Sequence, residues 1–159
     1  MLRIRGATKD DVALILRLVK ELALYEREPD AVVATEADLL RDGFGEKPLF
    51  HVLISEWNGE PAGFAFYFLQ YSTWTGRPVL YLEDLFVVPS LRKNGIGKAL
   101  MAALAKEAVR LNCGRFQWAV LDWNAPSIAF YESLGAHVRK EWLTVRLDGD
   151  SLRRLAESG

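Results

Sequence analysis

Cysteine is almost absent from this chain of 159 residues, which contains only Cys113. A single thiol cannot form an intrachain disulfide, and it leaves too few thiolate ligands for a structural zinc site. The acidic residues also lack the spacing of metal ligands, so we expect no bound metal. Half of the residues are hydrophobic. The fold must therefore depend on an ordinary apolar core rather than on cross-links.

The chain also lacks an excess of charge and a long apolar run. Its formal net charge of −1 gives no electrostatic reason to expect nucleic acid or a membrane surface as a partner. No apolar stretch approaches the roughly 20 residues of a membrane-spanning helix, and residues 1–5 do not resemble a signal peptide. We expect a cytoplasmic protein that binds neither nucleic acid nor membranes.

The length predicts one domain over residues 1–159. Hydrophobic periodicity predicts a mixed α/β fold with hairpins in the first half and a crossover helix in the second. The expected strands are residues 2–5, 50–56, 62–70, 79–88, 116–121 and 138–147. The expected helices are one capped by Thr8, with an apolar stripe to Ala23, and residues 36–42, 96–110, 127–134 and 150–156. Asn58-Gly59 predicts a hairpin turn, and residues 71–77 are expected to form a flexible loop beside a substrate.

A glycine-containing loop lies between the expected strand 79–88 and the following amphipathic helix. It reads Arg92-Lys93-Asn94-Gly95-Ile96-Gly97-Lys98. Glycine lets the backbone turn tightly, and the unpaired N–H groups at a helix start favour a phosphate or pyrophosphate. The spacing does not match a Walker A loop, because Ala99 follows Lys98 where Ser or Thr is required. A dinucleotide fingerprint also fails, because Leu100 occupies the third glycine position, and a merely flexible turn is the remaining alternative.

Two carboxylates, Glu83 and Asp84, interrupt the apolar strand just before this loop. Adjacent strand residues point to opposite faces, so we expect one carboxylate on each side of the sheet. Burying an ionised carboxylate without a partner is costly, which requires a functional or a structural reason. Glu83 could accept the proton of an incoming ammonium, or it could pair with an arginine or backbone N–H groups. For Asp84 the structural interpretation is favoured.

A second polar segment precedes the expected helix 127–134. Asn124 is expected to cap this helix, and Tyr131 lies about two turns into it. A tyrosine hydroxyl, whose pKa is ordinarily near 10, can donate a proton to a thiolate leaving group. A helical tyrosine can equally serve only to fill space in the core.

The motifs together resemble the GNAT superfamily of N-acetyltransferases. The R-x-x-G-x-G loop resembles its acetyl-CoA pyrophosphate loop, and W-N-x-P-S-I-x-F-Y at residues 123–131 is similar to its asparagine and tyrosine segment. With Tyr81 to Val87, and with residues 20–26 and 38–45 upstream, the pattern looks like the spermidine/spermine N1-acetyltransferase branch. The resemblance implies a central, mostly antiparallel sheet, flanked by helices, in which strands 79–88 and 116–121 splay apart.

The resemblance also implies roles for individual residues. Tyr131 would be the general acid, and Glu83 would assist deprotonation of the amine. Acetyl-CoA would be held by three segments, listed in chain order: Leu85, Phe86 and Val87; Arg92, Lys93, Asn94, Gly95, Ile96, Gly97 and Lys98; and Asn124, Ala125, Pro126 and Ser127. Tyr25, Glu26 and Glu83 would lie near the amine substrate.

The predicted function is transfer of an acetyl group from acetyl-CoA to a primary amine of a small polyamine, diamine or lysine-like substrate. Arg27 would repel a second ammonium if it faced the site, so the identity of the amine stays open. Cys113 lies at the far end of the long helix from the glycine loop, which favours direct attack in a ternary complex over an acyl-cysteine. The alternative is a non-catalytic acyl-CoA-binding regulatory module. The family also suggests a homodimer, for which the segment around Trp142 could supply the interface.

Overall fold

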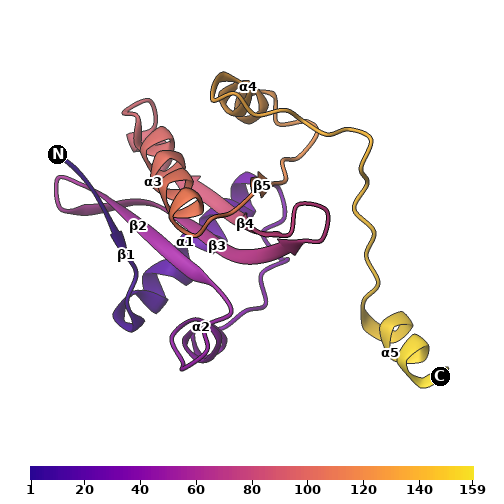
Figure 1. The fold of residues 1–159 in the computed structure, drawn as a ribbon. Coiled ribbons are helices and arrows are strands. Elements are labelled where there is room, and N and C mark those ends of the chain that lie inside the picture. The colour runs from indigo at the N-terminus through magenta and orange to yellow at the C-terminus, as the bar shows by residue number, and fades with distance from the viewer. The chain divides into compact units, whose positions relative to one another are not determined.

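The computed structural model describes residues 1–159, which divide into two compact units, residues 1–119 and 120–159. The first unit contains a five-stranded sheet and three α-helices (Figure 1). Its strands are β1 Leu2–Gly6, β2 His51–Trp57, β3 Glu60–Ser72, β4 Arg77–Val87 and β5 Arg115–Trp118. Its helices are α1 Val12–Tyr25, α2 Glu36–Gly43 and α3 Ile96–Arg110, with short 3-10 turns at η1 Lys9–Asp11 and η2 Pro89–Leu91.

The sheet follows the order of the chain, β1-β2-β3-β4-β5. Neighbouring strands from β1 to β4 are antiparallel, and β4 pairs with β5 in parallel. A parallel pair needs a crossover, which α3 supplies. Asn58 and Gly59 both have positive φ, 51° and 86°, as a two-residue type I′ hairpin turn requires. The mixed, mostly antiparallel sheet is therefore confirmed.

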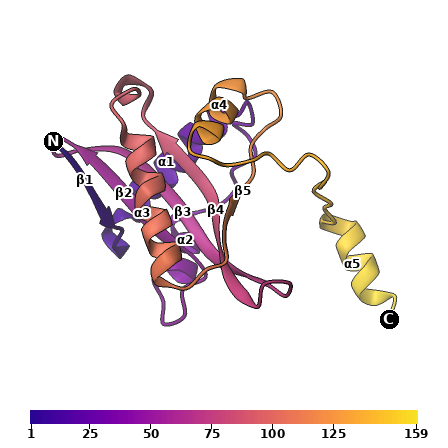
Figure 2. The same ribbon diagram turned by 45° about the horizontal axis from the view of Figure 1, so that its top comes forward.

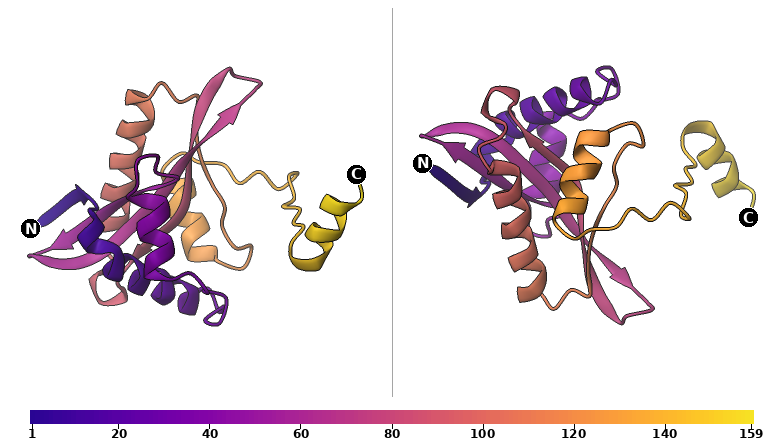
Figure 3. Two further views of the ribbon diagram at one scale, coloured as in Figure 1. Left: turned by 90° about the horizontal axis from the view of Figure 1, so that it is seen from below. Right: turned by 90° about the horizontal axis from the view of Figure 1, so that it is seen from above.

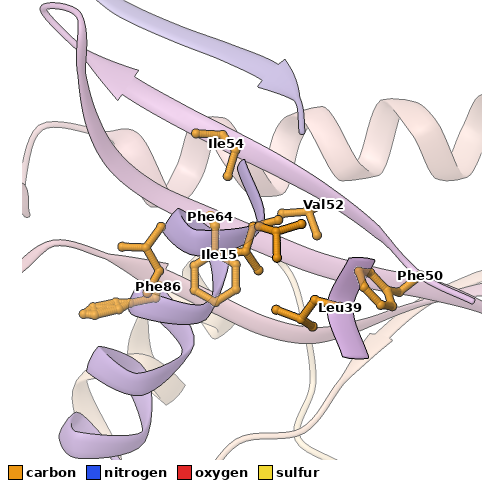
Figure 4. Close-up of a cluster of buried hydrophobic side chains, with 9 residues drawn as sticks. Ile15, Leu39, Phe50, Val52, Ile54, Phe64 and Phe86 are labelled. Carbon is orange, nitrogen blue, oxygen red and sulfur yellow. The ribbon is translucent and has the colours of Figure 1, made fainter. Parts of the chain in front are cut away.

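Helices cover both faces of the sheet. Figure 3 shows α1 and α2 on one face and α3 on the other. Between α1, α2 and the sheet lies a core of buried side chains (Figure 4). It consists of Val12, Ile15, Leu18, Leu39, Phe50, Val52, Ile54, Phe64 and Phe86. Burial of such side chains contributes about 1.5–3 kcal/mol each, and it favours the register that places Phe86 of β4 in this core.

Threonine caps begin the first two helical segments, as expected. Thr8 and Thr35 each accept a hydrogen bond from the backbone, and the carboxylates of Asp11 and Asp38 complete the two capping boxes. Asp11 also forms an ion pair with Arg5, whose guanidinium lowers the pKa of that carboxyl to about 2. This pair connects β1 to the start of α1.

Residues 71–77 form a tight hairpin turn rather than the flexible loop that the sequence predicted. β3 continues to Ser72 and β4 starts at Arg77. The Gly76 N–H donates to the Ser72 carbonyl at 2.9 Å, and the Thr75 N–H donates to Ser72 Oγ at 3.3 Å. The hairpin extends beyond the body of the sheet (Figure 2), and Trp74 at its tip is 84% exposed. This tip lies at the opposite end of β4 from the glycine loop.

The second unit contains α4 Ala125–Ser133 and α5 Gly149–Glu157, close to the expected helices. The predicted strand over residues 138–147 is wrong, because this segment is not a strand and takes part in no sheet. Extended residues with high strand propensity form a strand only when a neighbour pairs with their backbone. The segment instead exposes the large apolar side chains Val138, Trp142, Leu143, Val145 and Leu147. None of the helices in the structure has the length and apolar character to cross a membrane.

Candidate active site

The parallel strands β4 and β5 separate partway along β4. Their pairing runs from Val79 opposite Arg115 to Leu82 opposite Trp118, where β5 ends. β4 continues to Val87, and this last stretch pairs only with β3. The predicted strand 116–121 is therefore shorter at its far end. Residues 83–87 expose one backbone edge, to which an amide-bearing chain can bind as an added strand would.

A β-bulge lies where the strands separate. Phe66 of β3 pairs with Asp84, whereas the next β3 residue, Tyr67, pairs with Leu82. Glu83 is the extra residue, and it has no partner in β3. A bulge shifts the alternation of side chains by one residue, so two neighbours can lie on the same face. The bulge therefore removes the regular alternation on which the expectation of opposite faces for Glu83 and Asp84 was based, and the charge of Glu83 acts on both Asp84 and Glu26.

The pairing identifies the face that Asp84 shares with α1. Cross-strand partners lie on the same face of a sheet. The β3 residues Phe64, Phe66 and Phe68 belong to the core beneath α1 or pack against it. Their partners in β4 are Phe86, Asp84 and Tyr81, respectively. Tyr81 and Asp84 therefore lie on one face although they are three residues apart.

Three carboxylates interact on this face, one of them from the end of α1. Burial, followed by the nearby charges of Glu83 and Glu26, raises the pKa of Asp84 to about 7. Burial followed by the charge of Glu83 also raises the pKa of Glu26. Asp84 forms no hydrogen bond or ion pair that would offset its burial. The structural interpretation favoured for Asp84 from the sequence therefore has no partner group to support it.

This cluster of Glu26, Glu83 and Asp84 suits an organic cation. Glu83 is exposed to solvent, whereas Asp84 is mostly buried. No group of His, Cys, Asp and Glu side chains in the structure is arranged to hold a metal ion. An ammonium that enters the cluster would relieve the repulsion among the carboxylates, and Glu83 is the member most accessible to it.

Tyr25 lies beside the same cluster and contacts Arg92. The Arg92 guanidinium carbon is 4.8 Å from the centre of the Tyr25 ring and 5.5 Å from that of Phe86. Arg92 Nε also donates to the Val87 carbonyl at 3.0 Å. The residue that begins the glycine loop is thus in contact with the last residue of α1.

The glycine loop contains a run of backbone donors without a partner in the chain. Lys93 and Gly95 adopt left-handed conformations, with φ of 68° and 78°. The N–H groups of residues 93–98 make no hydrogen bond within the chain, and the first α3 bond in this region is from Ala99 to the Gly95 carbonyl. Residues of alternating hand followed by a helix N-terminus bind anions well. The donor set therefore fits a pyrophosphate, with Lys93 and Lys98 exposed on either side.

Gly63 keeps β3 and β4 close together at this end of the sheet, and it is not among the predicted site residues. A Cβ at this position would lie 2.3 Å from the Phe86 carbonyl oxygen and 3.1 Å from Ser55 Oγ. Glycine within a strand often marks a close backbone approach, which is the feature that could have revealed it. Because Gly63 has no side chain, β3 can pair closely with the open segment of β4.

The second unit holds the remaining predicted site residues. Asn124 is 6% exposed and caps α4, with its Oδ1 accepting from the Ser127 N–H at 3.3 Å. Pro126 lies in the first turn, where a missing N–H costs nothing. Tyr131 is partly exposed on α4, and its ring centre is 5.4 Å from that of Phe130. The predicted cap and helix are confirmed.

Cys113 lies beyond the C-terminal end of α3, at the opposite end of this 15-residue helix from the glycine loop. Burial raises the pKa of its thiol, which lowers the fraction of nucleophilic thiolate. Both observations argue against an acyl-cysteine.

Comparisons with known proteins agree with this geometry. The model of the acetyltransferase (GNAT) family matches residues 15–136. A thialysine N-epsilon-acetyltransferase of Sus scrofa has 42% sequence identity to this chain. The alignment covers 96% of this chain and 96% of the length of that protein. An L-ornithine N5-acetyltransferase of Arabidopsis thaliana has 32% sequence identity to this chain, in an alignment that covers 96% of this chain and 87% of the length of that protein.

The fold also matches a solved structure. An integron cassette protein from the mobile metagenome of V. cholerae superimposes with a TM-score of 0.82 and 30% identity, over 99% of this chain and 98% of that one. The parting of β4 from β5, the loop of free N–H donors and these matches lead to one conclusion. The chain belongs to the GNAT family of acetyltransferases.

Proposed function

We propose that this protein transfers the acetyl group of acetyl-CoA to a primary amine of a small diamine, polyamine or lysine-like substrate. The observation that carries the proposal is the convergence of Glu26, Glu83 and Asp84 where β4 leaves β5. A cationic substrate is attracted to this cluster, which lies beside the open backbone edge of β4.

In this proposal the cofactor is held by the segments that the sequence assigns to it. Acetyl-CoA supplies the acetyl thioester when bound. The main chain of Leu85 to Val87 accommodates the pantetheine arm, and the N–H groups of residues 93–98 bind the pyrophosphate. Asn124 to Ser127, the cap and first turn of α4, contact the cofactor as well.

Two side chains then move protons. Glu83, exposed at the bulge, accepts the ammonium proton directly or through water and so frees the amine lone pair. Tyr131 provides the proton that the departing sulfur requires. Attack is direct, because Cys113 is remote from the loop and its thiol is a weak nucleophile.

The relatives narrow the substrate class. The names of two relatives specify thialysine and ornithine. The name of a third, a human protein, specifies spermidine or spermine. That protein is 44% identical over 84% of this chain, but the match covers only 20% of its own length. These amines share a primary amino group on a flexible chain with a second charged group. The three carboxylates favour a second cation, whereas the exposed Arg27 next to Glu26 could pair with a substrate carboxylate.

In this proposal residues 1–159 form one N-acetyltransferase domain. The family match spans residues 15–136 and thus crosses the division between the units at residue 119. This match supports the single domain.

A homodimer would cover the apolar surface of the second unit. Trp142, Leu143 and Val145 are 67%, 84% and 91% exposed. Exposed apolar patches of this kind mark interaction surfaces. We expect twice the chain mass in sedimentation equilibrium, and a Trp142→Glu variant should shift the protein towards the monomer. A single chain mass for the unmodified protein at micromolar concentration would contradict the dimer.

Thiol release tests the activity itself. The protein is mixed with acetyl-CoA and, in turn, with spermidine, ornithine, thialysine and a neutral monoamine, while free coenzyme A thiol is followed. We expect release with at least one dicationic or amino acid substrate. Tight coenzyme A binding without release for any amine would instead support the non-catalytic acyl-CoA-binding module.

Replacing Glu83 by glutamine should lower kcat/KM most at neutral pH and less at alkaline pH. Free amine becomes abundant near the pKa of the substrate, about 10, and no longer needs a base. We expect a loss of about 10²-fold at pH 7. Glu60→Gln, at the exposed β2–β3 turn, is the matched control. An equal loss at every pH would argue against a base.

A further inference from the structure

Arg92 bridges two parts of the first unit that the proposed function assigns to different ligands. Its guanidinium lies 4.8 Å from the ring centre of Tyr25, at the end of α1, and 5.5 Å from that of Phe86, in β4. Its Nε donates to the Val87 carbonyl at 3.0 Å. One side chain thus contacts the amine side and the cofactor side of the site.

The β4 side of this bridge is rigid. Phe86 is 4% exposed and belongs to the core beneath α1, and Val87 pairs with Gly63 of β3. The hydrogen bond to Val87 and the Phe86 ring therefore determine where the guanidinium lies. Arginine suits this place because its planar group can stack on a ring while an N–H donates in its plane.

The Tyr25 side is less constrained. Tyr25 is the last residue of α1 and is 37% exposed, and the backbone turns immediately afterwards, with Arg27 at a φ of 65°. Glu26, which interacts with Glu83, is the next residue. The Arg92 contact therefore restrains the Tyr25 ring and, through the chain, the direction of Glu26.

We propose that Arg92 is a positioning residue that holds Tyr25 and Glu26 in place for the amine, rather than acting only as a ligand of the cofactor phosphates. The proposal rests on the proposed function, which places the amine beside Tyr25, Glu26 and Glu83. The two roles differ in the substrate whose KM they affect: a phosphate ligand controls KM for acetyl-CoA, and a positioning residue controls KM for the amine.

A double-mutant cycle tests this inference. A cation–π contact at an exposed site changes an equilibrium constant by about 2- to 5-fold. We expect Arg92→Gln to raise KM for the amine by about 3- to 5-fold, and to leave the Kd of acetyl-CoA, measured by calorimetry without amine, within about 2-fold. In a Tyr25→Leu background the same change should alter KM for the amine by less than about 1.5-fold, because the contact is already lost.

Two further variants complete the test. Arg92→Lys retains the charge and should recover part of the amine affinity, and it replaces Arg92→Gln if the latter fails to fold. Arg17→Gln, an exposed α1 arginine near Glu21, should leave both constants unchanged. Weaker acetyl-CoA binding with an unaltered KM for the amine would overturn the proposal, as would an equal effect in the Tyr25→Leu background. An unmodified protein that binds coenzyme A but acetylates no amine would instead refute the proposed function.

Discussion

Replacing Tyr131 by phenylalanine should lower kcat by about 10²-fold or more and leave the affinity for acetyl-CoA nearly unchanged. The substitution keeps the ring, and with it the contact to Phe130, and removes only the hydroxyl. A thiolate that leaves without a proton donor is a poorer leaving group, so the loss should appear in kcat rather than in binding.

Tyr67→Phe is the matched control for this experiment. Tyr67 is buried in β3, and the charges of Glu107 and Arg110 near the C-terminal end of α3 act on its hydroxyl. This is the end of α3 remote from the glycine loop. Loss of the Tyr67 hydroxyl should leave kcat within about 2-fold of the unmodified value. If Tyr131→Phe had equally little effect, Tyr131 would be a packing residue and another group would protonate the sulfur.

Replacing Asp84 by asparagine should stabilise the protein above pH 7. The folded protein holds the pKa of Asp84 near 7, whereas an unfolded aspartate titrates near 4. Between pH 4 and pH 7 the Asp84 carboxyl is protonated in the folded state and ionised in the unfolded state, so the free energy of unfolding falls as the pH rises. Below pH 4 both states are protonated and the penalty disappears. Asparagine does not titrate, so it should gain about 2–4 kcal/mol in the free energy of unfolding at pH 8 and nothing at pH 4.

Urea denaturation at several pH values measures this gain, and Asp11→Asn provides a control of opposite sign. Arg5 lowers the pKa of Asp11 to about 2, so its carboxylate stabilises the fold above pH 4 and loses that effect as pH falls. Asp11→Asn should therefore be destabilising at pH 7. A loss of stability for Asp84→Asn at pH 8 would mean that the Asp84 carboxylate is compensated in the fold.

The cost of Asp84 explains why its position is informative. A buried carboxylate beside two others destabilises the free protein, and a bound ammonium would offset that cost. Sites that bind charge often sacrifice stability in this way. We therefore expect the amine to bind more tightly at pH 8 than at pH 6, because a larger fraction of Asp84 is ionised at the higher pH.

Local chemistry made much of the fold predictable. Thr35 with Asp38 and the Asn58-Gly59 pair are short-range patterns that specify a helix start and a hairpin wherever they occur. The glycine loop was recognisable for the same reason, because Gly95 adopts a backbone conformation that other residues reach only with strain.

The errors arose where a neighbouring segment decides the structure. The bulge at Glu83 depends on the register of Phe66 and Tyr67 in β3, and nothing within residues 79–88 indicates it. Residues 138–147 have the composition of a strand but no partner strand. The raised pKa of Asp84 could not be predicted from residues 79–88 alone, because it depends first on burial and then on the charges of Glu83 and the distant Glu26.

The free N–H groups of residues 93–98 have a consequence for mutational studies. In the proposed role, the pyrophosphate is recognised by the peptide bonds themselves, and every amino acid except proline carries the same donor. Alanine scanning of Lys93, Asn94, Ile96 and Lys98 would remove charge and contact area but leave that recognition intact. Such a survey would therefore understate the importance of this loop, whose main contribution is made by atoms that truncation of side chains does not alter.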